Sequence, residues 1–131
     1  MILEIDFNSD EALYIQLRNQ IVIGIATSQL SAGDSLPSVR QLADRVGINM
    51  HTVNKAYTVL RQEGYVKLDR RKGAVIAIDC NKASARNKLL RDLQVMLAGA
   101  MCKGITRDAV HEMIDMIYDY YEQPANYPEE G

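Results

Sequence analysis

Two short amphipathic segments separated by Gly-Ile-Asn constrain the fold of this chain more than any other feature. The first is about two helical turns long, and its apolar side chains recur at helical spacing (Val39, Leu42, Ala43 and Val46). Ser38 and Gln41 form a capping box before it, and Gly47 is suited to end it. Asn49 can cap the second segment, whose apolar stripe is Val53, Ala56, Tyr57 and Leu60. Two short helices joined by a tight turn are therefore predicted.

The segments on either side extend this pair to a larger motif. Apolar residues at helical spacing predict a helix over residues 11–29, and three polar residues before it are candidate caps (Asn8, Ser9 and Asp10). After the third helix come two β-type runs, residues 65–68 and 74–78. Between them, residues 69–73 form a basic tip that contains a glycine, and this pattern is typical of a β-hairpin. Three helices and a hairpin make a winged helix-turn-helix, to which we assign residues 1–79.

The rest of the chain is predicted to be a hairpin of two helices. Apolar residues recur at helical spacing over 82–103, Gly104 breaks the run, and Thr106 can cap a second helix. Two helices alone cannot bury both of their apolar stripes, so we assign residues 80–123 to dimerisation. The predicted contacts are Leu89, Leu93, Met96, Leu97, Met101, Met113, Ile114, Ile117 and Tyr121. Packing is favoured over a ligand pocket for the methionines because they lie on or beside the apolar stripes. Residues 124–131 are predicted to be a flexible acidic tail.

Charge is distributed unevenly along the chain. The net charge is −2, but residues 35–76 hold eight basic and three acidic side chains, against seven and fourteen elsewhere. This asymmetry is expected where a single module contacts nucleic acid.

No apolar run is long enough to span a membrane and the N-terminus lacks a signal-peptide pattern, so a cytoplasmic protein is expected. Cys80 and Cys102 are expected to be reduced thiols, and neither a metal site nor a cofactor is predicted.

The predicted third helix turns a polar face away from its apolar stripe. At about 100° per residue, His51 and Lys55 lie opposite the stripe, and Asn54 and Thr52 flank that face. His51 and Asn54 can hydrogen-bond base edges in a major groove, while Thr52 and Lys55 can reach phosphate oxygens. The free N–H groups of the helix N-terminus also favour phosphate. An ordinary solvated helix face would show the same polarity, so the wheel alone does not decide between the two.

Leu36 to Val66, "LPSVRQLADRVGINMHTVNKAYTVLRQEGYV", resembles the signature of the GntR family of bacterial transcription regulators, and the short helical tail resembles its YtrA subfamily. The resemblance covers residues 11–78. It implies a dimeric repressor on a pseudo-palindromic double-stranded DNA operator. By position, Arg40 corresponds to the family's phosphate-contacting arginine, and the recognition-helix contacts fall on Asn49, Met50, His51, Thr52 and Asn54.

This sequence departs from the family pattern at three positions. Family members frequently have arginine at the positions of Met50 and Asn54, so a different operator sequence is expected. Met50 could equally pack against the core. Arg71 replaces the first glycine of the usual Gly-x-Gly wing, which makes the tip more basic and leaves its turn geometry open.

The predicted function is sequence-specific DNA binding by a transcription regulator. The predicted DNA contacts are Ser38, Arg40, Asn49, Met50, His51, Thr52, Asn54, Lys55, Arg70, Arg71 and Lys72. The alternative is a winged-helix adaptor that binds another protein, and a small-molecule effector acting on the tail is a further possibility. Motifs of enzymes such as a P-loop or Gly-x-Ser-x-Gly do not occur, so no enzymatic activity is predicted.

Overall fold

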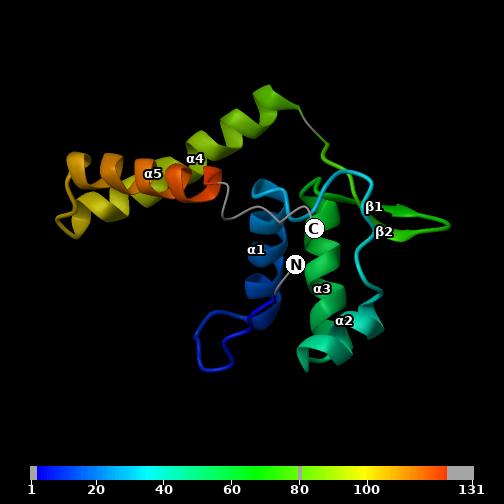
Figure 1. Cartoon of the computed structure of the whole chain (residues 1–131). Coiled ribbons are helices and arrows are strands. Elements are labelled where there is room, and N and C mark those ends of the chain that lie inside the picture. The colour runs from blue at the N-terminus through cyan, green and yellow to red at the C-terminus, as the bar shows by residue number, and fades with distance from the viewer. Residues whose placement is uncertain (1–2, 80, 124–131) are drawn as a thin grey trace. The chain divides into compact units, whose positions relative to one another are not determined.

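The computed structural model describes residues 3–79 and 81–123, and Figure 1 gives the order of its elements. These are α1 (Leu13–Ala26), α2 (Val39–Val46), α3 (Met50–Gln62), β1 (Val66–Asp69), β2 (Gly73–Ile76), α4 (Lys82–Cys102) and α5 (Arg107–Glu122). The described residues divide into two compact units, one that ends at Asp79 and one that follows it. The predicted fold class, mainly helical with a small β-hairpin, is confirmed. Cys80 and the predicted tail at 124–131 lie outside the described residues.

The predicted side-chain cap of α1 is wrong. The helix begins after Ala12, whose side chain makes no capping hydrogen bond. Of the three predicted candidates, Ser9 uses its side chain within the entry segment, where its Oγ accepts the Glu11 N–H at 3.1 Å. Asp6 Oδ1 likewise accepts the Asn8 N–H at 2.9 Å. Because these side chains satisfy the turns of the loop, they are not available to the helix.

Two glutamines of α1 hold the N-terminal segment in place. The buried Gln16 donates from Nε2 to the carbonyl oxygens of Asp6 and Glu11 at 3.0 Å, and its Oε1 accepts the Asp6 N–H at 2.9 Å. One turn later, Gln20 accepts the Glu4 N–H at 2.8 Å and donates to the Glu4 carbonyl oxygen. Each amide therefore pairs with a backbone N–H and C=O as a neighbouring strand would.

The C-terminal end of α1 is also earlier than predicted. Thr27 Oγ1 donates to the Ile23 carbonyl oxygen at 2.8 Å, and Ser28 has a φ of +63°. A residue in this left-handed conformation cannot continue a right-handed helix, so α1 ends at Ala26 rather than near residue 29.

The helix-turn-helix forms as its sequence predicts. Ser38 Oγ accepts the Gln41 N–H at 3.1 Å while Gln41 Oε1 accepts the Ser38 N–H at 3.0 Å, which completes the capping box of α2. Gly47 ends α2 with a φ of +78°. Asn49 Oδ1 then accepts the His51 N–H at 2.7 Å and caps α3. All of these bonds are local in sequence, which is why the pattern could be recognised there.

The core of the first unit lies between α1, α2, α3 and the hairpin. Helices α1 and α3 pack side by side (Figure 1). The predicted stripe of α3 is entirely buried (Val53, Ala56, Tyr57 and Leu60), and it packs with Leu17, Ile21, Leu36, Leu42, Val66 and Ile76. The Tyr57 hydroxyl donates to the Pro37 carbonyl oxygen at 2.7 Å, which ties α3 to the segment that precedes α2.

The wing is an antiparallel hairpin whose last pair is Asp69 with Gly73. Asp69 Oδ1 accepts the N–H groups of Arg71 and Lys72 at 2.8 and 3.0 Å, and Gly73 has a φ of +74°. Among the described residues, Ser28 is the only non-glycine with a positive φ. Arg71 therefore occupies the family's glycine position without strain, because Gly73 alone supplies the left-handed conformation.

Residues 34–36, which precede α2, lie along the outer edge of β2. The Leu36 N–H donates to the Ala74 carbonyl oxygen at 2.8 Å, the Ile76 N–H donates to Asp34 at 2.9 Å, and Ser35 and Val75 form an isolated bridge. The hairpin therefore has a short third partner, and the chain enters α2 directly from the wing.

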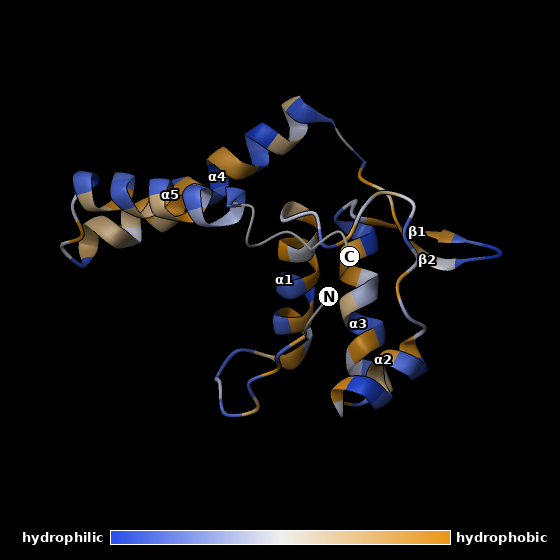
Figure 2. Ribbon diagram, in the orientation of Figure 1, coloured by the Kyte–Doolittle hydropathy of each residue, from blue (hydrophilic) through white to orange (hydrophobic). Residues whose placement is uncertain are grey.

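The second unit consists of α4 and α5. Asn81 Oδ1 accepts the Ser84 N–H and Thr106 Oγ1 accepts the Ala109 N–H, each at 3.1 Å, so both helices have side-chain caps. Gly104 turns the chain between them with a φ of +74°. Neither helix has a buried residue, and apolar side chains remain exposed on both. Figure 2 shows hydrophobic residues at intervals along both ribbons. Within residues 3–79 and 81–123, no helix is both long enough and apolar enough to cross a membrane.

Candidate nucleic-acid interface

An open hollow of about 610 Å³ lies at the N-terminal end of α3. It is lined by Val39, Asn49, Met50, His51 and Asn54. Met50 is 44% exposed, so its side chain lies on the surface and not in the core, which decides a question that the sequence left open. Four predicted DNA contacts from α3 and its cap are therefore brought together here.

The backbone donors of this helix end are mostly used within the protein. Asn49 takes the His51 N–H on its side chain and the Thr52 and Val53 N–H groups on its carbonyl oxygen. Within the described part of the chain, the Met50 N–H is the one donor of the first turn that keeps no acceptor. The expected set of free N–H groups is thus reduced to one, and an anion bound here would depend mainly on side chains.

A second hollow, of about 220 Å³, lies between α3 and the wing. Its lining residues come from the start of α2, from α3 and from both strands (Pro37, Ser38, Val39, Asn54, Tyr57, Thr58, Arg61, Val66, Leu68, Gly73 and Ala74). Val39 and Asn54 line both hollows. A continuous surface therefore runs from the N-terminus of α3 to the hairpin.

Six predicted contacts lie outside these hollows, three on α2 and α3 and three at the tip of the wing. Arg40 is exposed in the first turn of α2, and Thr52 is half-buried on α3. Lys55 is exposed, and its Nζ lies 4.0 Å from the centroid of the Tyr14 ring of α1. This cation–π contact was not predicted from the sequence, since it joins residues of two different helices.

The basic tip of the wing is fully on the surface. Arg70, Arg71 and Lys72 are exposed, and Figure 2 shows the tip as a hydrophilic end of the hairpin. The backbone N–H groups of Arg71 and Lys72 lower the pKa of the Asp69 carboxyl, because they bind its charged form. The carboxylate that shapes the tip is therefore ionised at neutral pH, and it offsets part of the positive charge around it.

The residues predicted for dimerisation are spread along both helices of the second unit. Met96 and Met101 are 67% and 78% exposed, and Ile117 is 52% exposed. Leu93 and Tyr121 are half-buried, and the remaining ones are exposed (Leu89, Leu97, Met113 and Ile114). These apolar surfaces have no cover within the described residues of the chain.

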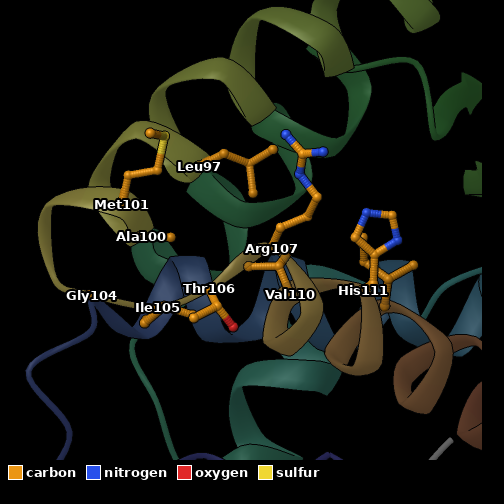
Figure 3. A pocket seen from close by; sticks show the side chains of 10 residues that line it. Leu97, Ala100, Met101, Gly104, Ile105, Thr106, Arg107, Val110 and His111 are labelled. Carbon is orange, nitrogen blue, oxygen red and sulfur yellow. The ribbon is translucent and has the colours of Figure 1, made fainter.

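A groove of about 560 Å³ lies where α4 turns into α5. Leu97, Ala100 and Met101 line it from α4, and Val110 and Ile114 from α5. Figure 3 shows the Arg107 side chain extending from α5 toward α4, with His111 one turn further along the same helix. Three of the predicted dimerisation residues border this groove, so the groove forms part of the predicted dimerisation surface.

Comparison with known proteins places these features in a family. The model for "Bacterial regulatory proteins, gntR family" matches residues 11–76, which span the winged helix-turn-helix. The HTH-type transcriptional repressor YtrA of Bacillus subtilis is 30% identical over 118 residues, which cover 88% of this chain and 91% of that protein. The match therefore extends through the second unit as well as the first.

Solved structures give the same result. YtrA from Sulfolobus acidocaldarius, a GntR-family transcription factor, is 33% identical with a TM-score of 0.59, and the match covers 92% of this chain and 99% of that one. A structure described as a transcriptional antiterminator from Listeria monocytogenes has a TM-score of 0.86 over 100% of this chain and 98% of its own, and at 22% identity it shows the shared fold. These matches favour a regulator over an adaptor, and the chain belongs to the GntR family of bacterial transcription regulators, with YtrA-like relatives.

Proposed function

We propose that this regulator binds a double-stranded DNA operator through the continuous surface of α3 and the wing. The observation that carries the proposal is that Asn54 and Val39 border both hollows, which joins the exposed N-terminal half of α3 to the hairpin. A recognition helix in the major groove with a wing on the flanking backbone requires such a connected surface.

The side chains on and around this surface divide by the chemistry they offer. His51 and Asn54 can hydrogen-bond base edges, and Met50 offers an apolar contact to a thymine methyl group. The remaining predicted contacts offer positive charge or hydroxyl donors to phosphate (Ser38, Arg40, Thr52, Lys55, Arg70, Arg71 and Lys72). Asn49 keeps its amide N–H groups for DNA because its oxygen already caps α3.

We also propose that α4 and α5 form a homodimer with the same helices of a second copy. Both helices leave apolar side chains exposed, and their charges are opposite. Helix α4 carries four basic residues and one acidic residue, whereas α5 carries one basic and five acidic residues. Pairing α4 of one copy with α5 of the other would cover the apolar faces and bring opposite charges together.

A two-fold dimer would present two recognition helices to successive major grooves, about 34 Å apart, and would therefore select a pseudo-palindromic operator. The Bacillus subtilis relative is named a repressor. Repression by occupying a promoter, within the cytoplasm, is the corresponding proposal for this chain. A small-molecule effector would act most directly at the dimer, where the groove at the α4–α5 turn lies.

The deciding experiment is selection of bound sequences from a random duplex pool with the purified protein. We expect an enriched inverted repeat, and sedimentation of the protein–DNA complex should give two chains per duplex. Recovery of a motif without inverted symmetry would refute the dimeric arrangement. Recovery of no motif by a folded protein would refute the proposed DNA-binding function.

A further inference from the structure

We propose that Arg61 is a further DNA contact, which holds a backbone phosphate over the hollow between α3 and the wing. No motif pointed to it, because it lies near the C-terminal end of α3, away from the predicted recognition residues. The inference rests on the proposed function, since it requires DNA on this surface.

Helical geometry places Arg61 on the same side of α3 as Asn54. Seven residues separate them, which corresponds to almost two full turns and a rise of roughly 10 Å. Both residues line the hollow beside the wing. Long side chains on a helix incline toward its N-terminus, so we expect the Arg61 guanidinium to extend along this face toward Asn54.

Arg61 is the only charged residue among the described residues that line this hollow. Its side chain is exposed, and within the described ranges no carboxylate pairs with it. The nearest acidic residue in sequence, Glu63, is engaged elsewhere, because its Oε1 accepts from Arg18 Nε at 2.8 Å. The positive charge of Arg61 is therefore available to a ligand.

The hydroxyl groups around Arg61 leave few other donors for an anion. The Thr58 hydroxyl donates to the Asn54 carbonyl oxygen at 2.8 Å, and the Tyr57 hydroxyl donates to Pro37. Ser38 keeps its hydroxyl proton, since its oxygen accepts from Gln41. The Arg61 guanidinium, the Ser38 hydroxyl and the Asn54 amide border a hollow whose other lining is mainly apolar. This set suits a phosphate, two oxygens of which arginine binds with two parallel hydrogen bonds.

A DNA strand would pass over this hollow if α3 lies in a major groove and the wing contacts the adjacent backbone. The strand between those two contacts presents phosphates, and base edges there face away from the protein. Arg61 is therefore expected to raise affinity for any duplex rather than to select a sequence.

The test is the salt dependence of binding for Arg61→Ala, with Lys103→Ala, between α4 and α5, as a matched loss of one exposed positive charge. Each lost phosphate contact lowers the slope of log affinity against log salt by about 0.9. The ratio of the wild-type affinity to the Arg61→Ala affinity should thus fall about threefold to fourfold per protomer between roughly 50 and 200 mM salt. This ratio should be similar on the selected operator and on random duplex. Arg61→Lys should keep most of the slope.

The contact can also be located on the DNA. Operators with one methylphosphonate at each backbone position in turn remove single phosphate charges. At one position per half-site, the substitution should weaken the wild type and leave Arg61→Ala unaffected. An unchanged slope for Arg61→Ala, or the absence of any such position, would overturn the proposal. If Arg71→Ala still lowers the slope in that case, the proposed function stands without Arg61, whereas a wild type that binds no duplex would reject both.

Discussion

The ammonium group of Lys55 on the recognition helix lies 4.0 Å from the centre of the Tyr14 ring on α1. Helix α1 has no expected contact with DNA, yet it holds a side chain that the sequence assigns to DNA. Lys55 must therefore either leave the ring when it reaches a phosphate or bind DNA from this position. In both cases, α1 influences the recognition surface through one aromatic residue.

A double-mutant cycle should measure this contact in the free protein. We expect Tyr14→Leu and Lys55→Met to show a coupling of about 0.5–1 kcal/mol in the free energy of unfolding, as for other exposed cation–π pairs. Urea unfolding of the four proteins gives the value. Tyr14→Phe should keep most of the coupling because the ring remains. Additive effects within error would mean that the contact contributes nothing to stability.

The buried hydroxyl of Tyr57 should contribute to stability through the Pro37 carbonyl group. Tyr57→Phe keeps the ring and removes the 2.7 Å hydrogen bond, so we expect a loss of about 0.5–1.5 kcal/mol in the free energy of unfolding. Tyr118→Phe, at an exposed ring of α5, is the control and should change little. Equal stability of Tyr57→Phe and the wild type would show that the hydrogen bond has no net effect.

Burial also makes Tyr57 a source of pH dependence. Desolvation raises the pKa of its phenol from the ordinary value of about 10, against a smaller opposing effect of Arg45. Above about pH 10 the unfolded chain loses this proton before the folded protein does. The contribution of the protonated phenol to the free energy of unfolding is therefore complete below pH 10 and declines as pH rises. Urea unfolding from pH 8 to 11 should show a shallower decline for Tyr57→Phe, and identical slopes would contradict the assignment.

Two single variants should distinguish a residue that reads bases from one that binds phosphate. His51→Ala should weaken the selected operator by about 1–3 kcal/mol more than random duplex, because a base contact is lost. Arg71→Ala should weaken both duplexes alike, because a phosphate contact is lost. Binding titrations of both variants on both duplexes give the comparison. If His51→Ala weakened the two equally, His51 would be removed from the base-reading residues.

The proposed dimer can be tested with two neighbours on α4. Met96 and Val95 are 67% and 75% exposed in the chain, so neither substitution by aspartate removes buried packing. Met96 lies on the predicted apolar stripe and Val95 lies off it. Met96→Asp should shift the protein toward monomer in sedimentation experiments, and Val95→Asp should not. A dimer that resists Met96→Asp would place the interface elsewhere.

The sequence identified those parts of the fold that depend on neighbours along the chain. The Ser38–Gln41 capping box, the Gly47 turn and the Asn49 cap join residues within four positions of one another, so their residue types alone predict them. The buried stripe of α3 follows equally from helical periodicity.

Contacts between distant segments could not be predicted in the same way. Asp6 and Ser9 have the chemistry of helix caps, but Gln16 and the turns of the entry segment determine where α1 begins. The pairing of Ser35 with Val75 joins positions forty residues apart. For the same reason, the sequence did not show that Arg61 shares a hollow with the wing, although the helical wheel places it beside Asn54.

The absence of buried residues from α4 and α5 has a consequence for gene control. If these helices obtain their core only from a second copy, the active species forms in proportion to the square of the chain concentration at low abundance. A cell that halves its supply of the chain then loses more than half of its operator-competent molecules. Promoter output would therefore respond to the rate of regulator synthesis with a threshold, without any further signal.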